Sequence, residues 1–60
     1  MKPKEIAAIR NRLGLTQKEL GGRLGVDSIT ISRWERGTQK PKPVHIRGLL
    51  RLEKKTSPTK

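Results

Sequence analysis

The segment Gln17–Arg36 most constrains this chain, because it reads as two short helices joined by one tight turn. Leu20 and Leu24 lie four residues apart, which is the spacing of one ridge on a helix. Gly25 then favours the end of that helix, since glycine enters the left-handed C-cap conformation without a Cβ clash. Asp27 is suited to cap a second helix that begins at the next residue. The segment therefore predicts two helices packed closely across a turn.

The second helix, residues 28–36, has two different sides when it is projected at about 100° per residue. One side carries two apolar residues and an acid: Ile31, Trp34 and Glu35. The other carries one apolar residue and two arginines, with hydroxyls at its edges: Ile29, Arg33 and Arg36, with Thr30 and Ser32. Arginine reads guanine and aliphatic groups meet thymine methyls in the DNA major groove. This outer side therefore suits a groove better than bulk water.

The segment also resembles the helix-turn-helix of the phage repressor/Cro-like (XRE-type) regulators. The resemblance is carried by Gln17, Leu20, Gly21, Leu24, Gly25, Val26, Ile31, Trp34 and Glu35. The flanking segments IRNRLGLTQKEL and WERGTQKP extend it over roughly residues 6 to 52. The alternative, a helical hairpin from a small bundle without a ligand, leaves the outer side of residues 28–36 unexplained.

The charge of the chain indicates a polyanionic partner. Its 60 residues hold 15 Lys and Arg against 5 Asp and Glu, for a net charge of +10. Such a balance favours nucleic acid or an anionic membrane surface, although a basic surface can also simply be solvated. Apolar runs are too short for a membrane span, and the absence of cysteine removes disulfides and thiolate metal sites. We therefore expect a cytoplasmic, nucleoid-associated protein that does not bind membranes.

An enzyme is not expected. The chain has one histidine, His45, and one aspartate, and its glutamates are accounted for by caps, pairing or solvation. These residues offer no acid–base or metal-binding constellation, so we expect no catalytic residue, metal or cofactor. His45 is interpreted as an ordinary surface or helix N-terminal residue.

A first helix is expected over residues 3–13, with Gly14 at its end. Its apolar stripe brings Arg10 to an inward or bordering position, where an unpaired guanidinium would be costly. Glu35 is the only acid placed inward on another helix, and relatives in the resembling family carry Arg and Glu at these two places. We therefore predict an Arg10–Glu35 ion pair of structural role; the alternative is that Arg10 extends into solvent along its aliphatic stem.

Phosphate contacts are expected on both sides of the reading helix. Thr16 and Glu19 form a capping box at the start of a helix, where free N–H groups and the dipole attract anions. Two prolines stiffen the basic loop after Gly37, which would run along the DNA backbone. The residues assigned to phosphate contact are Gln17, Lys18, Ser32, Arg36, Lys40 and Lys42. Simple capping, with Gln17 in water, and a solvated linker remain the alternatives.

A fourth helix is expected to open at Pro43 and to run for about ten residues. Ile46, Leu49 and Leu50 are predicted to close the core, whereas Val44, Gly48 and Leu52 lie off that stripe. The chain departs here from the fuller family pattern, which continues into a fifth helix. The expected domain is residues 1–53, followed by a flexible basic tail, 54–60. Dimerisation is left open, with Val44 and Leu52 as a candidate edge.

Together these features predict an all-α, lambda-repressor-like bundle of four short helices without a clear fifth helix. The expected function is sequence-specific binding of double-stranded DNA by a transcriptional regulator, of repressor type, on a pseudo-palindromic operator. Whether a homodimer occupies that operator is left open. The residues expected to read bases are Ser28, Ile29, Thr30 and Arg33. One alternative is the DNA-binding antitoxin of a toxin–antitoxin pair, with a toxin as partner. A more distant alternative is non-specific RNA binding. Against it, Trp34 is the only aromatic residue of the Phe, Trp and Tyr class and is expected to be buried, so no aromatic surface remains on which unpaired bases could stack.

Overall fold

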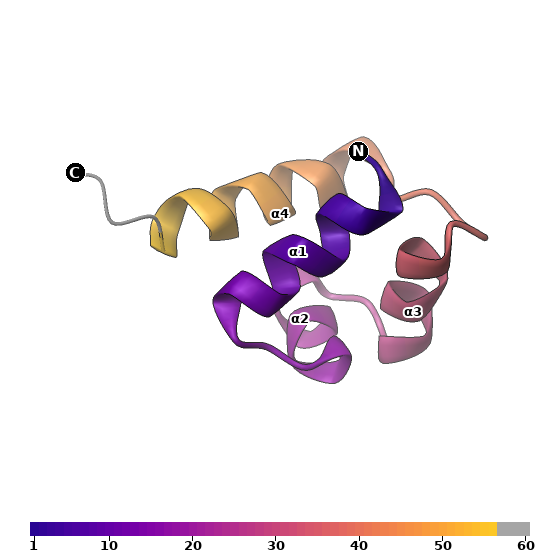
Figure 1. Cartoon of the computed structure of the whole chain (residues 1–60), viewed down its shortest axis with the longest axis horizontal. Coiled ribbons are helices and arrows are strands. Elements are labelled where there is room, and N and C mark those ends of the chain that lie inside the picture. The colour runs from indigo at the N-terminus through magenta and orange to yellow at the C-terminus, as the bar shows by residue number, and fades with distance from the viewer. Residues whose placement is uncertain (57–60) are drawn as a thin grey trace.

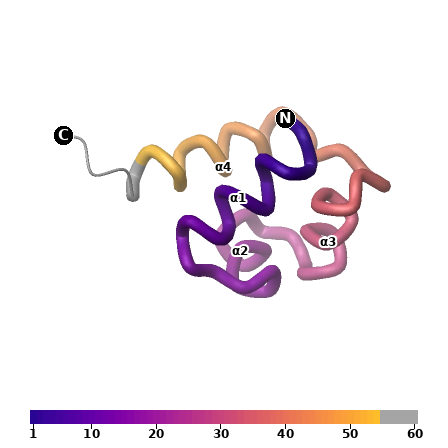
Figure 2. The backbone as a smooth tube through the Cα atoms, viewed as in Figure 1, coloured from indigo at the N-terminus to yellow at the C-terminus, as the bar shows by residue number. Residues whose placement is uncertain are grey.

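The computed structural model describes residues 1–56, with side chains described as far as Lys54. Its elements are α1 (Pro3–Leu13), α2 (Gln17–Leu24), α3 (Ser28–Arg36) and α4 (Pro43–Thr56). In the view of Figure 1, α1 lies between α4 above and the α2–α3 pair below. The backbone trace shows the same order, with a short connection from α2 to α3 and a second loop that leads from α3 back to α4 (Figure 2). Within the described residues the fold is all-α, as predicted.

Both ends of α2 and the start of α3 lie where the sequence predicts them. The Thr16 hydroxyl accepts a hydrogen bond from the Glu19 N–H at 3.0 Å, and the Glu19 carboxylate accepts one from the Thr16 N–H at 2.8 Å. Asp27 caps α3, because its Oδ1 accepts from the Thr30 N–H at 2.9 Å. Gly25, with φ of 77°, ends α2 in the left-handed conformation. Local chemistry therefore fixes both ends of the turn that joins α2 to α3.

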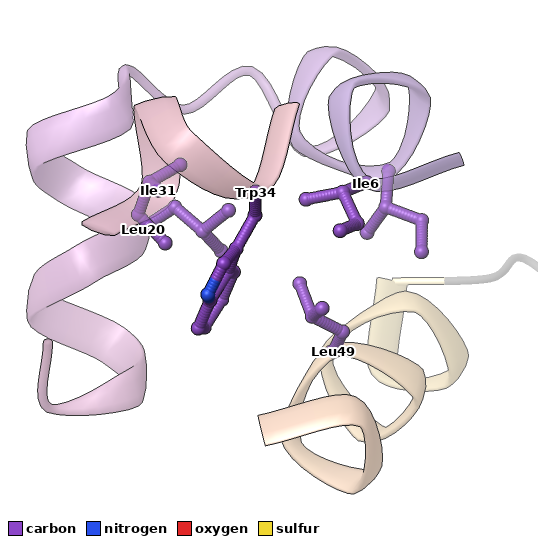
Figure 3. Close-up of a cluster of buried hydrophobic side chains, with 6 residues drawn as sticks. Ile6, Leu20, Ile31, Trp34 and Leu49 are labelled. Carbon is purple, nitrogen blue, oxygen red and sulfur yellow. The ribbon is translucent and has the colours of Figure 1, made fainter. Parts of the chain in front are cut away.

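The core is small and lies where the four helices meet (Figure 3). Its buried residues come from every helix: Ile6, Ile9, Leu20, Ile31, Trp34 and Leu49. Trp34 is only 1% exposed, so its indole ring points into the core as predicted. A core of this size buries little apolar area for a chain of this length, so polar links between the helices matter to its stability.

The inward stripe of α4 differs from the prediction. Leu49 is fully buried and Leu52 packs against the core, but Leu50 is 49% exposed. Successive helix residues differ by about 100°, so Leu52 lies within about 60° of Leu49, whereas Leu50 is turned away. The assignment of Leu50 to the core was therefore wrong, as was the placing of Leu52 off the stripe. Of the candidate dimerisation edge, only Val44 is exposed.

Gly48 and Gly21 mark the two places where neighbouring elements approach most closely. A Cβ at Gly48 would lie 2.7 Å from Leu24 Cδ2, so Gly48 faces α2 and does not lie off the stripe. A Cβ at Gly21 would lie 2.5 Å from the Val26 carbonyl oxygen, which is backbone. Gly21 therefore lets the turn close tightly over α2.

Helix α4 is longer than predicted, because it continues to Thr56. Residues 54–56, which were assigned to a tail, are helical. The remainder of the predicted tail, residues 57–60, lies outside the described residues. No fifth helix occurs within residues 1–56.

Gly21 and Gly22 are adjacent in α2 but should respond oppositely to the same substitution. A Cβ added at Gly22 would meet no other atom within 4 Å. Gly22→Gln should therefore raise the free energy of unfolding by about 0.5–1 kcal/mol, the usual penalty of glycine in a helix. Gly21→Gln should lower it, since the new side chain meets the Val26 backbone. Urea denaturation of both variants checks this, and equal shifts would contradict the close approach.

Candidate nucleic-acid interface

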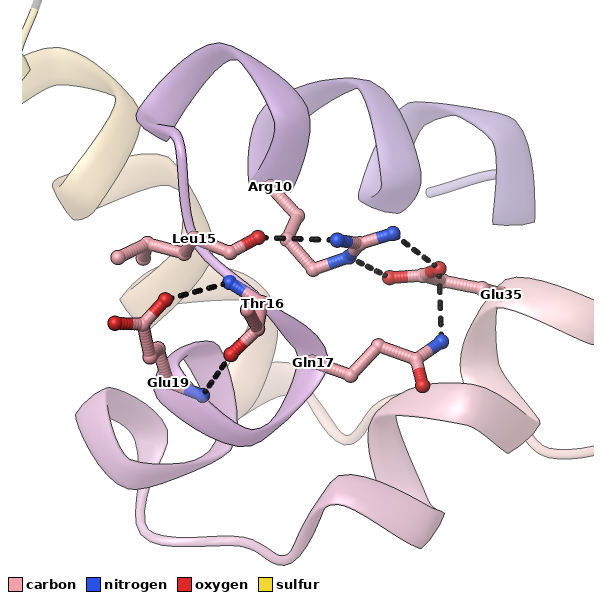
Figure 4. A network of polar contacts seen from close by, with 6 residues as sticks. All are labelled: Arg10, Leu15, Thr16, Gln17, Glu19 and Glu35. Atoms are coloured by element: carbon pink, nitrogen blue, oxygen red, sulfur yellow. Dashed lines mark hydrogen bonds and ion pairs between the residues drawn. The ribbon is translucent and has the colours of Figure 1, made fainter.

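An ion pair between Arg10 of α1 and Glu35 of α3 fixes the orientation of the third helix (Figure 4). The Arg10 Nε donates to Glu35 Oε2 at 2.7 Å, and its Nη2 donates to Glu35 Oε1 at 3.2 Å. The Arg10 Nη1 donates to the Leu15 carbonyl at 3.0 Å. The two side chains are only 18% and 11% exposed. The predicted pair is thus present, and its hydrogen bonds offset the cost of taking both charges out of water.

Gln17 belongs to the same network. Its Nε2 donates to Glu35 Oε1 at 3.2 Å, so the first residue of α2 is tied to the inner side of α3 (Figure 4). No pattern in the sequence links these two residues, which lie 18 positions apart. Gln17 therefore has a structural partner within the domain, and its contact with phosphate stays a prediction. We call Arg10, Leu15, Gln17 and Glu35 the α1–α3 clamp.

The clamp and the core together determine which side of α3 reaches solvent. Ile31 and Trp34 point inward, so Ile29, Arg33 and Arg36 are left on the outside, with Ile29 58% exposed. The flanking hydroxyl residues are half-buried: Ser28, Thr30 and Ser32. The Thr30 hydroxyl donates to Asp27 Oδ1 at 2.6 Å, so its methyl group remains as the freer part of the side chain.

Exposed cationic side chains occur on the segments that precede and follow α3 in the chain. Lys18 is exposed at the start of α2, and Lys40 and Lys42 are exposed in the loop that follows α3. The capping box already satisfies the N–H groups of residues 16 and 19. The N–H groups of the first two α2 residues, 17 and 18, have no acceptor within the helix and remain oriented outward.

The acids of the chain are engaged in helix caps and ion pairs. Each carboxylate accepts a hydrogen bond within the fold: those of Glu5, Glu19, Asp27, Glu35 and Glu53. The side-chain and backbone donors of Thr30 lower the pKa of Asp27, and the backbone N–H and hydroxyl of Thr16 lower the pKa of Glu19. The hydrogen bond to Glu35 raises the pKa of Arg10. Because the acids serve caps and pairs, the excess charge is presented by exposed lysines and arginines.

Two contacts made by α4 had no signal in the sequence. Arg12 of α1 pairs with Glu53 of α4, although 41 positions separate them. His45 lies in the first turn of α4, which agrees with the helix N-terminal interpretation, but it is half-buried, with its ring centroid 5.1 Å from that of Trp34. Both contacts hold α4 against the rest of the domain. Within residues 1–56, no three His, Cys, Asp or Glu side chains gather in a way that could hold a metal ion.

Comparison with known proteins identifies the family. The helix-turn-helix family model matches residues 6–52, which include all of α2 and α3. The chain belongs to this family, and the XRE-type resemblance expected from the sequence is confirmed. No helix among the described residues is long and apolar enough to cross a membrane.

A viral relative shares part of the chain. It is described as an uncharacterized HTH-type transcriptional regulator of Acanthamoeba polyphaga mimivirus, and it is 53% identical over 34 residues. The aligned segment is 57% of this chain but 15% of the relative, so this chain spans a small part of the relative's length.

The two arginine–carboxylate pairs of α1 should differ greatly in their effect on stability. Arg10→Ala leaves Glu35, whose side chain is only 11% exposed, without its cation and should lower the free energy of unfolding by about 3 kcal/mol. Arg12→Ala removes a side chain that is 66% exposed and should cost less than about 1 kcal/mol. Chemical denaturation of both variants measures the difference. Equal losses would mean that the clamp does not hold α3.

The lowered pKa of Asp27 predicts how acid affects stability. A carboxyl whose pKa is lower in the folded state stabilises it fully above the unfolded pKa of about 4, and this contribution is lost as the pH falls through the folded value. Asp27→Ser keeps an N-cap oxygen but removes the titrating group. The melting temperature of this variant should therefore fall less steeply than that of the wild type between about pH 5 and about pH 2. Parallel curves would show that the Asp27 cap is not coupled to its charge.

Proposed function

We propose that this chain is a transcriptional regulator that binds double-stranded DNA in a sequence-specific manner, with α3 in the major groove. The observation that carries the proposal is the outer side of α3, where an exposed isoleucine is followed by two exposed arginines on a helix held from within by the clamp. The helix-turn-helix family match and the regulator-like relative support DNA binding and transcription regulation.

In this proposal the inner side of α3 stabilises the fold and the outer side recognises DNA. Ile31, Trp34 and Glu35 are committed to the core and the clamp, so they are not free to meet a ligand. Arg33 lies one turn after Ile29, and both are exposed. In the proposed complex Arg33 donates two hydrogen bonds to a guanine, worth about 1–3 kcal/mol of discrimination. Ile29 and the Thr30 methyl meet thymine methyls, and Ser28 lies nearest the base edges at the helix start.

The residues around α3 position the helix on the duplex. Lys18 and the free N–H groups at the start of α2 face one strand, and Gln17 adds its remaining N–H to the same phosphate while Glu35 holds the other. Arg36 and Ser32, with Lys40 and Lys42, contact the backbone on the opposite side. Such contacts set affinity and register without reading sequence.

In this proposal the chain represses by occupying a promoter, which needs no chemistry from the protein. Two copies on a pseudo-palindrome, with about 10–10.5 base pairs between half-site centres, would match the usual geometry of this motif. Both the repressor role and the pairing of copies on DNA belong to the proposal.

Replacing Arg33 and replacing Lys40 by alanine should change DNA binding in different ways. Binding to a random-sequence duplex pool is profiled by sequencing for the wild type, Arg33→Ala and Lys40→Ala. Arg33→Ala should relax the preference at one position of each half-site, by about 1–3 kcal/mol. Lys40→Ala should weaken all duplexes alike and reduce the salt slope by about one unit. Identical profiles for the two variants would remove the assignment of Arg33 to base reading.

A further inference from the structure

The outer side of α4 carries a second cationic surface, distinct from that of α3. Arg47, Arg51 and Lys54 are all exposed, at spacings of four and three residues, so they form one row along the helix. Val44 and Leu50, which are 63% and 49% exposed, border this row. We call these five residues the α4 row. Apart from Ile29 on α3 and Met1, they include every large apolar residue exposed in the described part of the chain.

The α4 row faces away from the outer side of α3. Trp34 of α3 and Leu49 of α4 both point into the core from their own helices (Figure 3). His45 contacts Trp34 with ring centroids 5.1 Å apart, so the inner sides of α3 and α4 meet. Their outer sides are therefore turned in different directions. A duplex lying along α3 would leave the α4 row uncovered.

A second copy of this chain is a poor occupant for the α4 row. Two such surfaces placed together would bring three cations of one copy against three of the other, and like charges repel. Compensating carboxylates are scarce, because the chain has 5 Asp and Glu against 15 Lys and Arg, and Glu35 and Glu53 already pair with Arg10 and Arg12. Self-association through this side of α4 would therefore be opposed by its charge.

We infer that the α4 row is a docking surface for an acidic amphipathic helix of a partner protein. Carboxylates of such a helix would pair with Arg47, Arg51 and Lys54, and its apolar side would cover Val44 and Leu50. The row runs from residue 44 to residue 54, or about 15 Å along the helix, which matches three turns of a partner helix. A duplex offers the charge but only isolated thymine methyls to the two bordering residues, whereas the apolar side of a helix would cover both. The inference does not depend on DNA binding by α3.

The test titrates the whole chain, labelled with ¹⁵N, with a capped 14-residue peptide that carries leucines on one side of its helix and glutamates on the flanks. A scrambled peptide of the same composition is the control. The designed peptide should shift the amides of the α4 row and bind more tightly than the scrambled one at physiological salt. Arg47→Glu with Arg51→Glu should weaken binding about tenfold, since it replaces two attractions by repulsions. Val44→Ser with Leu50→Ser should weaken it as well.

The matched control is Lys4→Glu with Arg23→Glu, which makes the same change in net charge at exposed sites on α1 and α2. It should leave peptide binding within about twofold of the wild type. An equal loss in this control, equal binding of the scrambled peptide, or amide shifts confined to α3 would overturn the inference. It would also be overturned if a random-sequence duplex shifted the α4 row at lower concentration than the peptide, which would indicate a second nucleic-acid surface.

Discussion

The fold depends on one polar interaction, the ion pair between Arg10 and Glu35. Six side chains make up the buried core, so apolar contact alone holds the helices weakly. The clamp adds directional bonds from Arg10 to α3 and to the Leu15 carbonyl, and a further bond from Gln17 to Glu35. The largely buried Glu35 carboxylate thus accepts hydrogen bonds from α1 and α2 together. This arrangement fixes the rotation of α3 about its axis, which hydrophobic packing, being non-directional, specifies less sharply.

That rotation is what the proposed function requires. If α3 turned by one residue, about 100°, Glu35 would leave its partners and Ile29 and Arg33 would leave the outer side. The same residues therefore stabilise the fold on one side and define the reading surface on the other. The charge balance contributes too, since 15 Lys and Arg against 5 acids leave the chain positively charged, and the acids serve caps and pairs.

The sequence predicted those features that depend on local chemistry or on a single candidate partner. Thr16, Gly25 and Asp27 determine helix ends through atoms within a few residues, and Glu35 was the only inward acid available to Arg10. The interior of α4 was harder. Leu49, Leu50 and Leu52 are all apolar, and only the contact of α4 with α1 and α2 decides which two turn inward. The family resemblance did not resolve this, because the chain departs from the family pattern in that region.

Contacts between side chains far apart in the sequence were predicted least well. Gln17 has an amide that can bond to water, phosphate or protein, and nothing near it in the sequence favours Glu35 over the others. The tilted ring contact between His45 and Trp34 likewise depends on the angle at which α4 returns over the core. These contacts follow from the way in which whole helices pack together. Residue spacing within one helix carries no information about that packing.

The central claim is that the clamped helix α3 presents its outer side to DNA. The most direct measurement is the change in amide chemical shifts of the whole chain when a duplex selected for tight binding is added at physiological salt. We expect the shifts to concentrate at residues 16–18, 28–36 and 38–42. Shifts concentrated on residues 44–54, with α3 unchanged, would contradict this account.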